Sequence, residues 1–292
     1  MALERISASR IIVGLLVAVM SLLCLLPFWL TVSGSLTAES EIISEGFSLW
    51  PQEISTLAYE YLFANSRSIA SGYRVSIFVT AFGTAFSLFV TALMAYPLSR
   101  PDVKYRNHLT FFAFFTMLFH GGMVPWYIVT TQILGLRDVI WALIFPYAIQ
   151  AWNMILLRNF FRTIPTELIE SAKIDGAHEF VIFARIAAPL SVPGLATIGL
   201  FIALLYWNDW WLGLMLINDE ELYPLQLLLR RIVSAVQFLQ SAPPGADTSG
   251  ITLPSEGVKM ATAIVTLGPI LLLYPWVQRY FVKGIMIGAV KG

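Results

Sequence analysis

The sequence predicts an all-α fold, that of a polytopic membrane protein. Of the 292 residues, 58% are hydrophobic and only 12% are charged, whereas soluble domains carry about 25% charged residues. Six stretches lack Asp, Glu, Lys and Arg, and each is long enough to cross the hydrocarbon core as a helix, which takes roughly 20 residues. The strands of a transmembrane barrel are shorter, about 10 residues, and alternate in hydrophobicity. We therefore expect a helical bundle.

Each charge-free stretch predicts one transmembrane helix. The stretches open, in order, after Arg10, Arg74, Arg106, Asp138, Arg185 and Lys259. The helices inside them are expected near residues 11–33, 75–97, 110–132, 139–157, 189–211 and 260–280. The sequence shows no internal repeat and no soluble second domain, so residues 1–292 are expected to form a single transmembrane domain.

The first of these segments could instead be a signal peptide, because Arg5 and Arg10 precede it and small polar residues follow it. Its apolar part, residues 11–32, is longer than the 7–15 residues of a typical signal core. We therefore expect a helix that is retained.

The charged residues are distributed unevenly over alternate loops. With a cytoplasmic N-terminus, twelve of the 18 basic residues lie on the inner side and twelve of the 18 acidic residues lie on the outer side. The positive-inside rule then places both termini in the cytoplasm. The net charge of zero gives no reason to expect nucleic acid as a partner. The apolar stretches predict that the chain is surrounded by the lipid bilayer.

Two segments on the outer side are long, residues 34–74 and 212–259. The second contains a Pro/Gly/Ser-rich run over residues 241–250, which is most simply a flexible loop. Before that run, residues 222–239 are apolar enough to lie on the membrane surface or to pack on the bundle.

The inner loop between the fourth and fifth predicted helices, residues 164–189, has a local shape of its own. Pro165 and Thr166 suit a helix start, and Gly176 suits the left-handed position at which a helix ends. A second short helix is expected over residues 178–187. Apolar residues interspersed with charges make the first helix amphipathic, so it either lies on lipid or docks in a groove of another protein.

The same loop carries a motif of fixed spacing. Its residues are Glu170, Ser171, Ala172, Asp175, Gly176, Ala177, Ile186 and Pro189. They resemble the EAA loop of the membrane subunits of binding-protein-dependent ABC importers, in which Glu-Ala-Ala is followed by three residues, Gly, nine residues, Ile, one residue and Leu-Pro. The spacing matches throughout, and the sequence departs from the pattern only at Ser171 and at Ala188, which replaces the leucine.

Three further segments resemble the carbohydrate-uptake branch of these permeases, within which the chain is similar to the lipoprotein-permease-like group that imports oligosaccharides and polysaccharide fragments. They are residues 158–162, residues 207–209 and the C-terminal residues 281–292. The resemblance implies a type I importer fold with six transmembrane helices in a prokaryotic cytoplasmic membrane. It also implies four kinds of neighbour: lipid, a second permease subunit, two ATP-binding subunits and an extracytoplasmic solute-binding protein.

For the EAA loop the resemblance implies a mechanical role. In the family, this helix sits in a cleft of an ATPase subunit, and ATP-driven closure of two such subunits moves the helix and rocks the attached spans. Glu170 would then make a charge-assisted contact with a basic residue of the ATPase, and Asp175-Gly176 would form the turn that aims the helix. The alternative for Glu170 is a solvated carboxylate that the helix dipole favours.

The sequence lacks the motifs of several kinds of enzyme and cofactor site. The sequence has no Gly-Lys pair and hence no phosphate-binding loop, so ATP and magnesium are expected on a partner ATPase and no cofactor on this chain. One cysteine and three scattered histidines give no expected metal site. Protease and hydrolase motifs are missing as well, so the chain is not expected to be an enzyme.

A carbohydrate pathway needs aromatic faces and hydrogen-bonding groups inside the bundle, where polar residues are costly and usually functional. The candidates are His120 in the third predicted helix, Tyr147, Trp152 and Asn153 in the fourth, and Trp207, Asn208 and Asp209 in the fifth. Each has an alternative, because Trp and Tyr gather at membrane interfaces and polar side chains join helices. The glycines beside His120 would permit close helix contact or a local break.

The leading hypothesis is that the chain is one of the two transmembrane subunits of an ATP-driven importer of a carbohydrate, and that this carbohydrate is an oligosaccharide. Its main rival is a secondary transporter driven by an ion gradient. That class needs paired carboxylates within its helices, and Asp209 stands alone there. An intramembrane enzyme and a membrane scaffold without transport are two weaker hypotheses.

Overall fold

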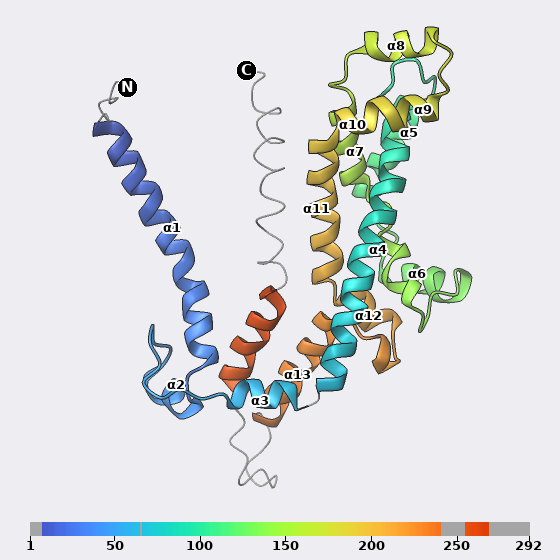
Figure 1. The fold of residues 1–292 in the computed structure, drawn as a ribbon. Helices are drawn as coiled ribbons and strands as arrows, with labels where there is room; N and C mark the ends of the chain where they lie inside the picture. Colours follow the sequence, from blue (N-terminus) through green and yellow to red (C-terminus); the bar gives the residue numbers. More distant parts are fainter. Residues whose placement is uncertain (1–7, 65, 241–254, 269–292) are drawn as a thin grey trace. The chain divides into compact units, whose positions relative to one another are not determined.

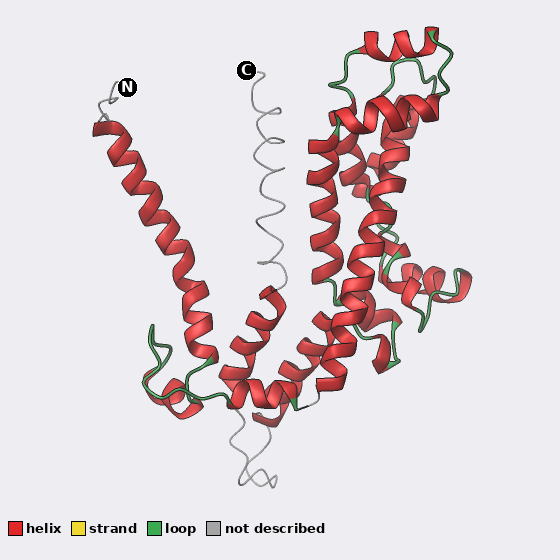
Figure 2. Cartoon of the chain, in the orientation of Figure 1, coloured by secondary structure: helices red, strands yellow, loops and turns green. Residues whose placement is uncertain are grey.

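The computed structural model of the chain describes residues 8–64, 66–240 and 255–268. These residues form helices joined by loops, with a single β-bridge between Thr37 and Ile54 and no β-strand among them (Figures 1 and 2). The predicted all-α class is thus confirmed. The later part of the predicted helix 260–280 and the C-terminal segment 281–292 lie outside the described residues.

The described residues form two compact units. Unit 1 holds residues 8–64, 66, 229–240 and 255–268, and unit 2 holds residues 67–228. The α-helices of unit 1 are α1 (Ala8–Ser35), α2 (Glu39–Glu45), α3 (Leu57–Phe63) and a helix over residues 255–268. Those of unit 2 are α4 (Ser66–Ser99, from Arg67 on), α5 (Arg106–Leu118), α6 (Met123–Ile128), α7 (Ala151–Phe161), α8 (Thr166–Ile174), α9 (Glu179–Ile182), α10 (Ala188–Leu190), α11 (Val192–Asn208) and α12 (Trp211–Leu216). The chain passes from unit 2 into unit 1 within α13 (Leu225–Gln240).

Two carboxylates organise the part of unit 1 that follows α1. Glu39 accepts hydrogen bonds from the Ser255 hydroxyl at 2.7 Å and from the backbone N–H of Gly257 at 3.2 Å, and so caps the helix 255–268 at the end that favours negative charge. Glu41 accepts from the backbone N–H groups of Gln52 and Glu53, and these bonds lower the pKa of its carboxyl. Acidic residues of the segment after α1 therefore hold its loop and its contact with the helix 255–268 in place.

Two described helices are long and apolar enough to cross a membrane, α1 from Ile12 on and the whole of α4. Three further pairs of helices meet this test only when each pair is taken together, and each pair is bent by more than 40°. The described residues thus contain between two and five membrane-crossing segments by length and composition.

The predicted helix over residues 110–132 is broken. The structure ends α5 at Leu118, starts α6 at Met123 and turns the axis by 113° between them. Gly122 lies at the turn with φ +91°, a conformation that glycine adopts at little steric cost. A charge-free stretch predicts how much chain is apolar, but it does not predict the direction of that chain.

The predicted helix 139–157 is likewise bent, and the predicted helix 189–211 follows a bend at its start. The first consists of two 3₁₀ turns, Ile140–Leu143 and Phe145–Tyr147, followed by α7 after a bend of 54°. The second begins properly at Val192, after an 84° bend from the segment Glu179–Leu190. Proline lacks the N–H that would continue the ladder of helical hydrogen bonds, and the chain has prolines at positions 189 and 193, on either side of the second bend.

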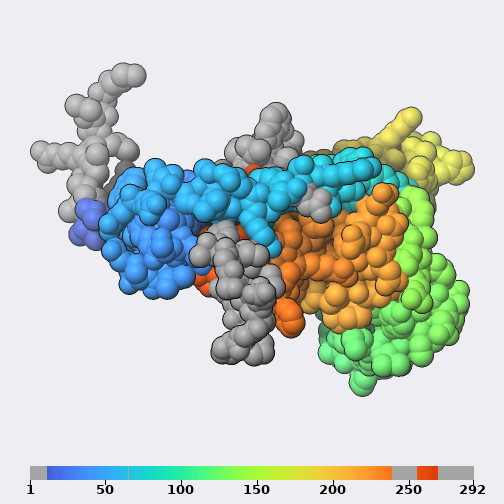
Figure 3. All heavy atoms as spheres, turned by 90° about the horizontal axis from the view of Figure 1, so that it is seen from below, coloured from blue at the N-terminus to red at the C-terminus, as the bar shows by residue number. Residues whose placement is uncertain are grey.

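Tight helix contacts form the core of unit 2. A Cβ added to Gly83 of α4 would lie 2.9 Å from the ring of Tyr206, and one added to Gly194 of α11 would lie 2.5 Å from Phe160. At the start of α4, the Ser76 hydroxyl accepts a hydrogen bond from the backbone N–H of Leu225 at 2.9 Å, and these two segments lie side by side in the space-filling view (Figure 3). Along unit 2, α8 and α9 lie at one end of α4 and α11, and α12 lies at the other (Figure 1).

Candidate functional site

The helix α8 starts and ends where local chemistry predicted. It begins at Thr166, directly after Pro165, and Gly176 has φ +80° just beyond its last residue. Three backbone hydrogen bonds close the turn, the last from the N–H of Ala177 to the carbonyl oxygen of Ala172 at 3.0 Å. The second short helix predicted over residues 178–187 is α-helical over Glu179–Ile182 and continues as a π-turn over Phe183–Ala187.

The two faces of α8 differ in burial. Ile169 is buried at 5% exposure and belongs to the hydrophobic core, and Ala172 and Ala177 pack partly buried against that core. Ile174, in contrast, is 87% exposed. The other candidate coupling residues divide as follows: Glu170, Ser171, Asp175, Gly176 and Pro189 are exposed, and Ile186 is partly buried. The helix is thus fixed on one side and accessible on the other.

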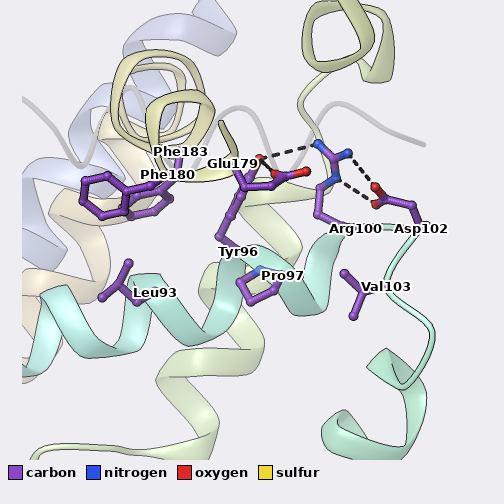
Figure 4. A pocket seen from close by; sticks show the side chains of 9 residues that line it. All are labelled: Leu93, Tyr96, Pro97, Arg100, Asp102, Val103, Glu179, Phe180 and Phe183. Carbon is purple, nitrogen blue, oxygen red and sulfur yellow. Dashed lines mark hydrogen bonds and ion pairs between the residues drawn. The ribbon is translucent and has the colours of Figure 1, made fainter. Parts of the chain in front are cut away.

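A cluster of charged side chains joins α8 to the end of α4. Lys173 of α8 donates to Asp102 at 2.8 Å and pairs with Glu179 of α9 at 2.7 Å. The guanidinium of Arg100 holds both oxygens of Asp102, each at 3.1 Å. Tyr96 donates its hydroxyl hydrogen to Glu179 at 3.2 Å. Figure 4 shows Tyr96, Arg100, Asp102 and Glu179 beside one another.

The charges of this cluster stabilise one another. Hydrogen bonds from Arg100 and Lys173 hold the pKa of the Asp102 carboxyl far below its ordinary range. Asp102 and Glu179 accept from the Lys173 ammonium and raise its pKa. Asp102 and Lys173 therefore both keep their charges at neutral pH.

Sequence reasoning singled out none of these residues as part of a site. Asp102 and Lys173 are 71 residues apart in the chain, and nothing local pairs them. A usable signal was the pattern of positive and negative charges. Arg100 and Asp102 follow the long charge-free stretch 75–99, and Lys173 and Glu179 lie in the loop that carries the motif.

At the opposite end of unit 2, two of the candidate pathway residues lie in contact. The Tyr147 hydroxyl donates to one carboxylate oxygen of Asp209 at 3.0 Å, and the other oxygen accepts from the backbone N–H of Leu212 at 3.1 Å. Asp209 therefore links the 3₁₀ turn before α7 to the start of α12. Its carboxylate holds a corner of the fold together.

Tyr206 stabilises the same corner. It is 2% exposed and donates to the backbone carbonyl of Ile144 at 2.8 Å, while its hydroxyl lies 2.8 Å from that of Ser87. The sequence pattern placed Tyr206 beside the candidate residues of the fifth helix and contained no indication of Ser87. A serine in an apolar helix is a weak signal of a contact between helices, because its hydroxyl can donate a hydrogen bond to a carbonyl oxygen of its own helix as readily as to a group on a neighbouring helix.

The remaining candidates do not gather in one place. Asn153 and Trp207 are buried, at 4% and 8% exposure. Asn208 is exposed, and its amide nitrogen donates to the carbonyl oxygen of Leu204 at 2.8 Å. Trp152 is 57% exposed, and His120 is also exposed. The buried residues contribute to packing inside this chain, and the exposed ones are accessible to a partner, lipid or solute.

The sequence and the structure both match a known family. A family model described as "Binding-protein-dependent transport system inner membrane component" matches residues 68–287. This range contains the EAA-like loop and all seven candidate pathway residues.

Curated relatives match more than nine tenths of the chain. The chain is 45% identical to the "Polygalacturonan/rhamnogalacturonan transport system permease protein YtcP" of Bacillus subtilis over 272 residues, 93% of this chain and 94% of the relative. It is 44% identical to the "Protein LplC" of the same organism, over 92% of this chain and 90% of the relative.

A solved structure supports the same assignment. It is described as a bacterial ABC transporter involved in the import of the acidic polysaccharide alginate, and it matches with a TM-score of 0.77 and 30% sequence identity over 94% of this chain and 98% of that chain. The matched family consists of membrane subunits without catalytic activity. The chain therefore belongs to the inner membrane components of binding-protein-dependent transport systems and is a permease subunit of a bacterial ABC importer.

Proposed function

We propose that this chain is one of two permease subunits of an importer that moves an oligosaccharide across the cytoplasmic membrane, and that α8 couples it to an ATPase. The observation that carries the proposal is the asymmetry of α8, which is anchored through Ile169 and exposes Glu170 and Ile174. An amphipathic helix with a free face is suited to a groove on another protein. The complete importer in this proposal holds a second permease, two ATP-binding subunits that carry ATP and magnesium, and a solute-binding protein.

The names of the relatives support a carbohydrate as the solute. Two of those named above concern polygalacturonan and rhamnogalacturonan or alginate, and a further relative, 27% identical over the whole of this chain, is named for melibiose, raffinose and stachyose import. The two that concern acidic polysaccharides are 45% and 30% identical to this chain. We therefore propose a fragment of an acidic polysaccharide as the solute.

Reversing the charge of Glu170 is expected to weaken the contact with the ATPase. A hydrogen bond to a charged group contributes about 1.5–3 kcal/mol, so Glu170→Lys should lower the affinity at least about tenfold. The measurement is copurification of the ATPase with the tagged permease, followed by ATP-dependent uptake into proteoliposomes. Glu53→Lys is the matched control, because Glu53 is exposed and lies in unit 1. Uptake by the isolated chain without ATP would overturn the proposal in favour of a secondary transporter.

Among the candidate pathway residues, Asn208 is the sharpest test. Because its side chain is exposed at the end of α11, Asn208→Ala should remove a hydrogen bond to the solute and leave assembly intact. Losing one hydrogen bond of about 0.5–1.5 kcal/mol predicts a decrease in uptake of about two- to tenfold. The probe is a labelled galacturonic acid oligosaccharide with raffinose as comparator, and Asn107→Ala, on the exposed first turn of α5, is the control. Unchanged uptake would remove Asn208 from the pathway.

A further inference from the structure

The coupling helix α8 is joined to the end of α4 through a charged cluster that the proposed function does not include. We name it the ionic clasp and define it as Arg100, Asp102, Lys173 and Glu179. Asp102 is held on one side by the bidentate guanidinium of Arg100 and on the other by the ammonium of Lys173. Lys173 is in turn shared between Asp102 and Glu179, at 2.8 and 2.7 Å. The clasp thus ties three elements together: the loop after α4, α8 and α9.

The surroundings of the clasp are loosely packed. A cavity of about 320 Å³ lies between the end of α4 and α9, and Phe180 on its wall is 62% exposed. Figure 4 shows Leu93, Phe180 and Phe183 on one side of this cavity and Arg100, Asp102 and Val103 on the other. The rings of Tyr96 and Phe183 pack beside this cavity, and the charged contacts add directional constraints where the cavity leaves the junction unfilled.

The position of α4 gives the clasp a mechanical role. This helix is 34 residues long, about 50 Å at 1.5 Å per residue. Near its other end, the Ser71 hydroxyl donates to the carbonyl oxygen of Glu221 at 3.1 Å, beyond α12. A displacement of α8 that reaches α4 can therefore be carried to the corner held by Tyr147 and Asp209.

We propose that the ionic clasp transmits the movement of α8 to α4, with Asp102 and Lys173 as the positioning residues. The proposal rests on the proposed function, in which an ATPase moves α8. Without the clasp, α8 would remain attached through Ile169, Ala172 and its two chain ends, and part of its movement would be lost in the loops. ATP would then be hydrolysed with less solute transported.

Folding should survive loss of the Lys173 ion pairs, because both are partly exposed, whereas Arg100 is buried. The side chains of Lys173, Asp102 and Glu179 are 37%, 49% and 56% exposed, and ion pairs at such exposure contribute little to stability. Variants of the clasp can therefore be tested in the intact importer.

The first experiment measures solute transported per ATP hydrolysed by the reconstituted importer. Lys173→Met should lower this ratio by at least about fivefold, and Lys173→Arg, which keeps the charge, should restore most of it. Lys104→Met is the matched control, since Lys104 is in the same loop as Asp102 and lies over the ring of Tyr105. A double variant, Asp102→Asn with Lys173→Met, should be no worse than either single variant, because the two residues act as a pair. A normal ratio for Lys173→Met, or additive losses, would overturn the proposal.

The second experiment does not depend on transport. Hydrogen exchange of the purified chain in lipid nanodiscs should be faster over residues 166–177 in Lys173→Met than in the wild type, and unchanged in Lys104→Met. Unchanged exchange in Lys173→Met would overturn the clasp even if the importer works. Faster exchange in a chain that shows no ATP-driven uptake would support the clasp as a contact and overturn the proposed function instead.

Discussion

Replacing Gly176 by valine is expected to leave the chain in the membrane and to lower ATP-driven uptake by about fivefold or more. Gly176 has φ +80°, and forcing a non-glycine residue into such a conformation costs about 1–3 kcal/mol. A Cβ at this position would meet no atom within 4 Å. The cost is therefore strain in the turn and not a clash, and it changes the direction in which α8 is held.

Asparagine is the matched control at this position, because it tolerates the left-handed conformation better than other residues with a Cβ. Uptake and ATP hydrolysis are measured in the same proteoliposomes for Gly176→Val, Gly176→Asn and the wild type. The asparagine variant should keep most of the uptake. Uptake at the normal rate by the valine variant would contradict a role for this turn in coupling.

Replacing Gly194 by alanine is expected to destabilise the whole of unit 2. The added Cβ would lie 2.5 Å from Cγ and 2.8 Å from Cδ1 of Phe160, so α7 and α11 must move apart or Phe160 must leave its rotamer. Overpacking of this kind costs about 1–3 kcal/mol. A lower midpoint of thermal unfolding in detergent and a lower yield in the membrane should both result.

Two variants separate this steric effect from a general sensitivity to alanine. Gly14→Ala makes the same change in α1, where an added Cβ meets nothing within 4 Å, and the midpoint should stay the same. Adding Phe160→Ala to Gly194→Ala removes the Cγ and Cδ1 contacts, but it opens a cavity, so it should restore only part of the loss. If Gly194→Ala unfolds at the wild-type temperature, the close contact between α7 and α11 is not needed for stability.

The sequence predicted those features that depend on a few neighbouring residues. The start of α8 at Thr166 and the left-handed Gly176 after it follow from proline and glycine, which restrict or extend the backbone wherever they occur. The helical class follows from the lengths of the charge-free stretches. These features need no knowledge of what packs against them.

The directions of the helices were predicted less well. The segment around Gly122 has the composition of a single span, yet its axis turns by 113°. Hydrophobic length reports the free energy of removing a segment from water, which is nearly the same for a straight helix and for a broken one. The energetic difference lies in packing and in backbone groups at the break, which the sequence pattern does not contain.

For the candidate pathway residues too, the sequence indicated which residues are polar in apolar stretches, and only the structure shows what they contact. The sequence made Tyr147 and Asp209 candidates as polar residues in apolar stretches, and the structure adds that they bind each other. That contact uses part of the hydrogen-bonding capacity of both side chains. Asn208, although next to Asp209 in the chain, is exposed at the end of its helix.

By itself, the sequence determined that this protein is an α-helical membrane subunit with an EAA-like loop, because hydrophobic length, charge asymmetry and motif spacing are properties of the chain. The tertiary structure alone decided that Asp102 and Lys173 meet, that Tyr206 bonds to Ser87 and Ile144, and that Gly194 leaves room for Phe160. Coulombic attraction, hydrogen bonding and steric contact act over a few ångströms of space. Partners 34 to 119 residues apart in the chain become neighbours only when the helices have packed.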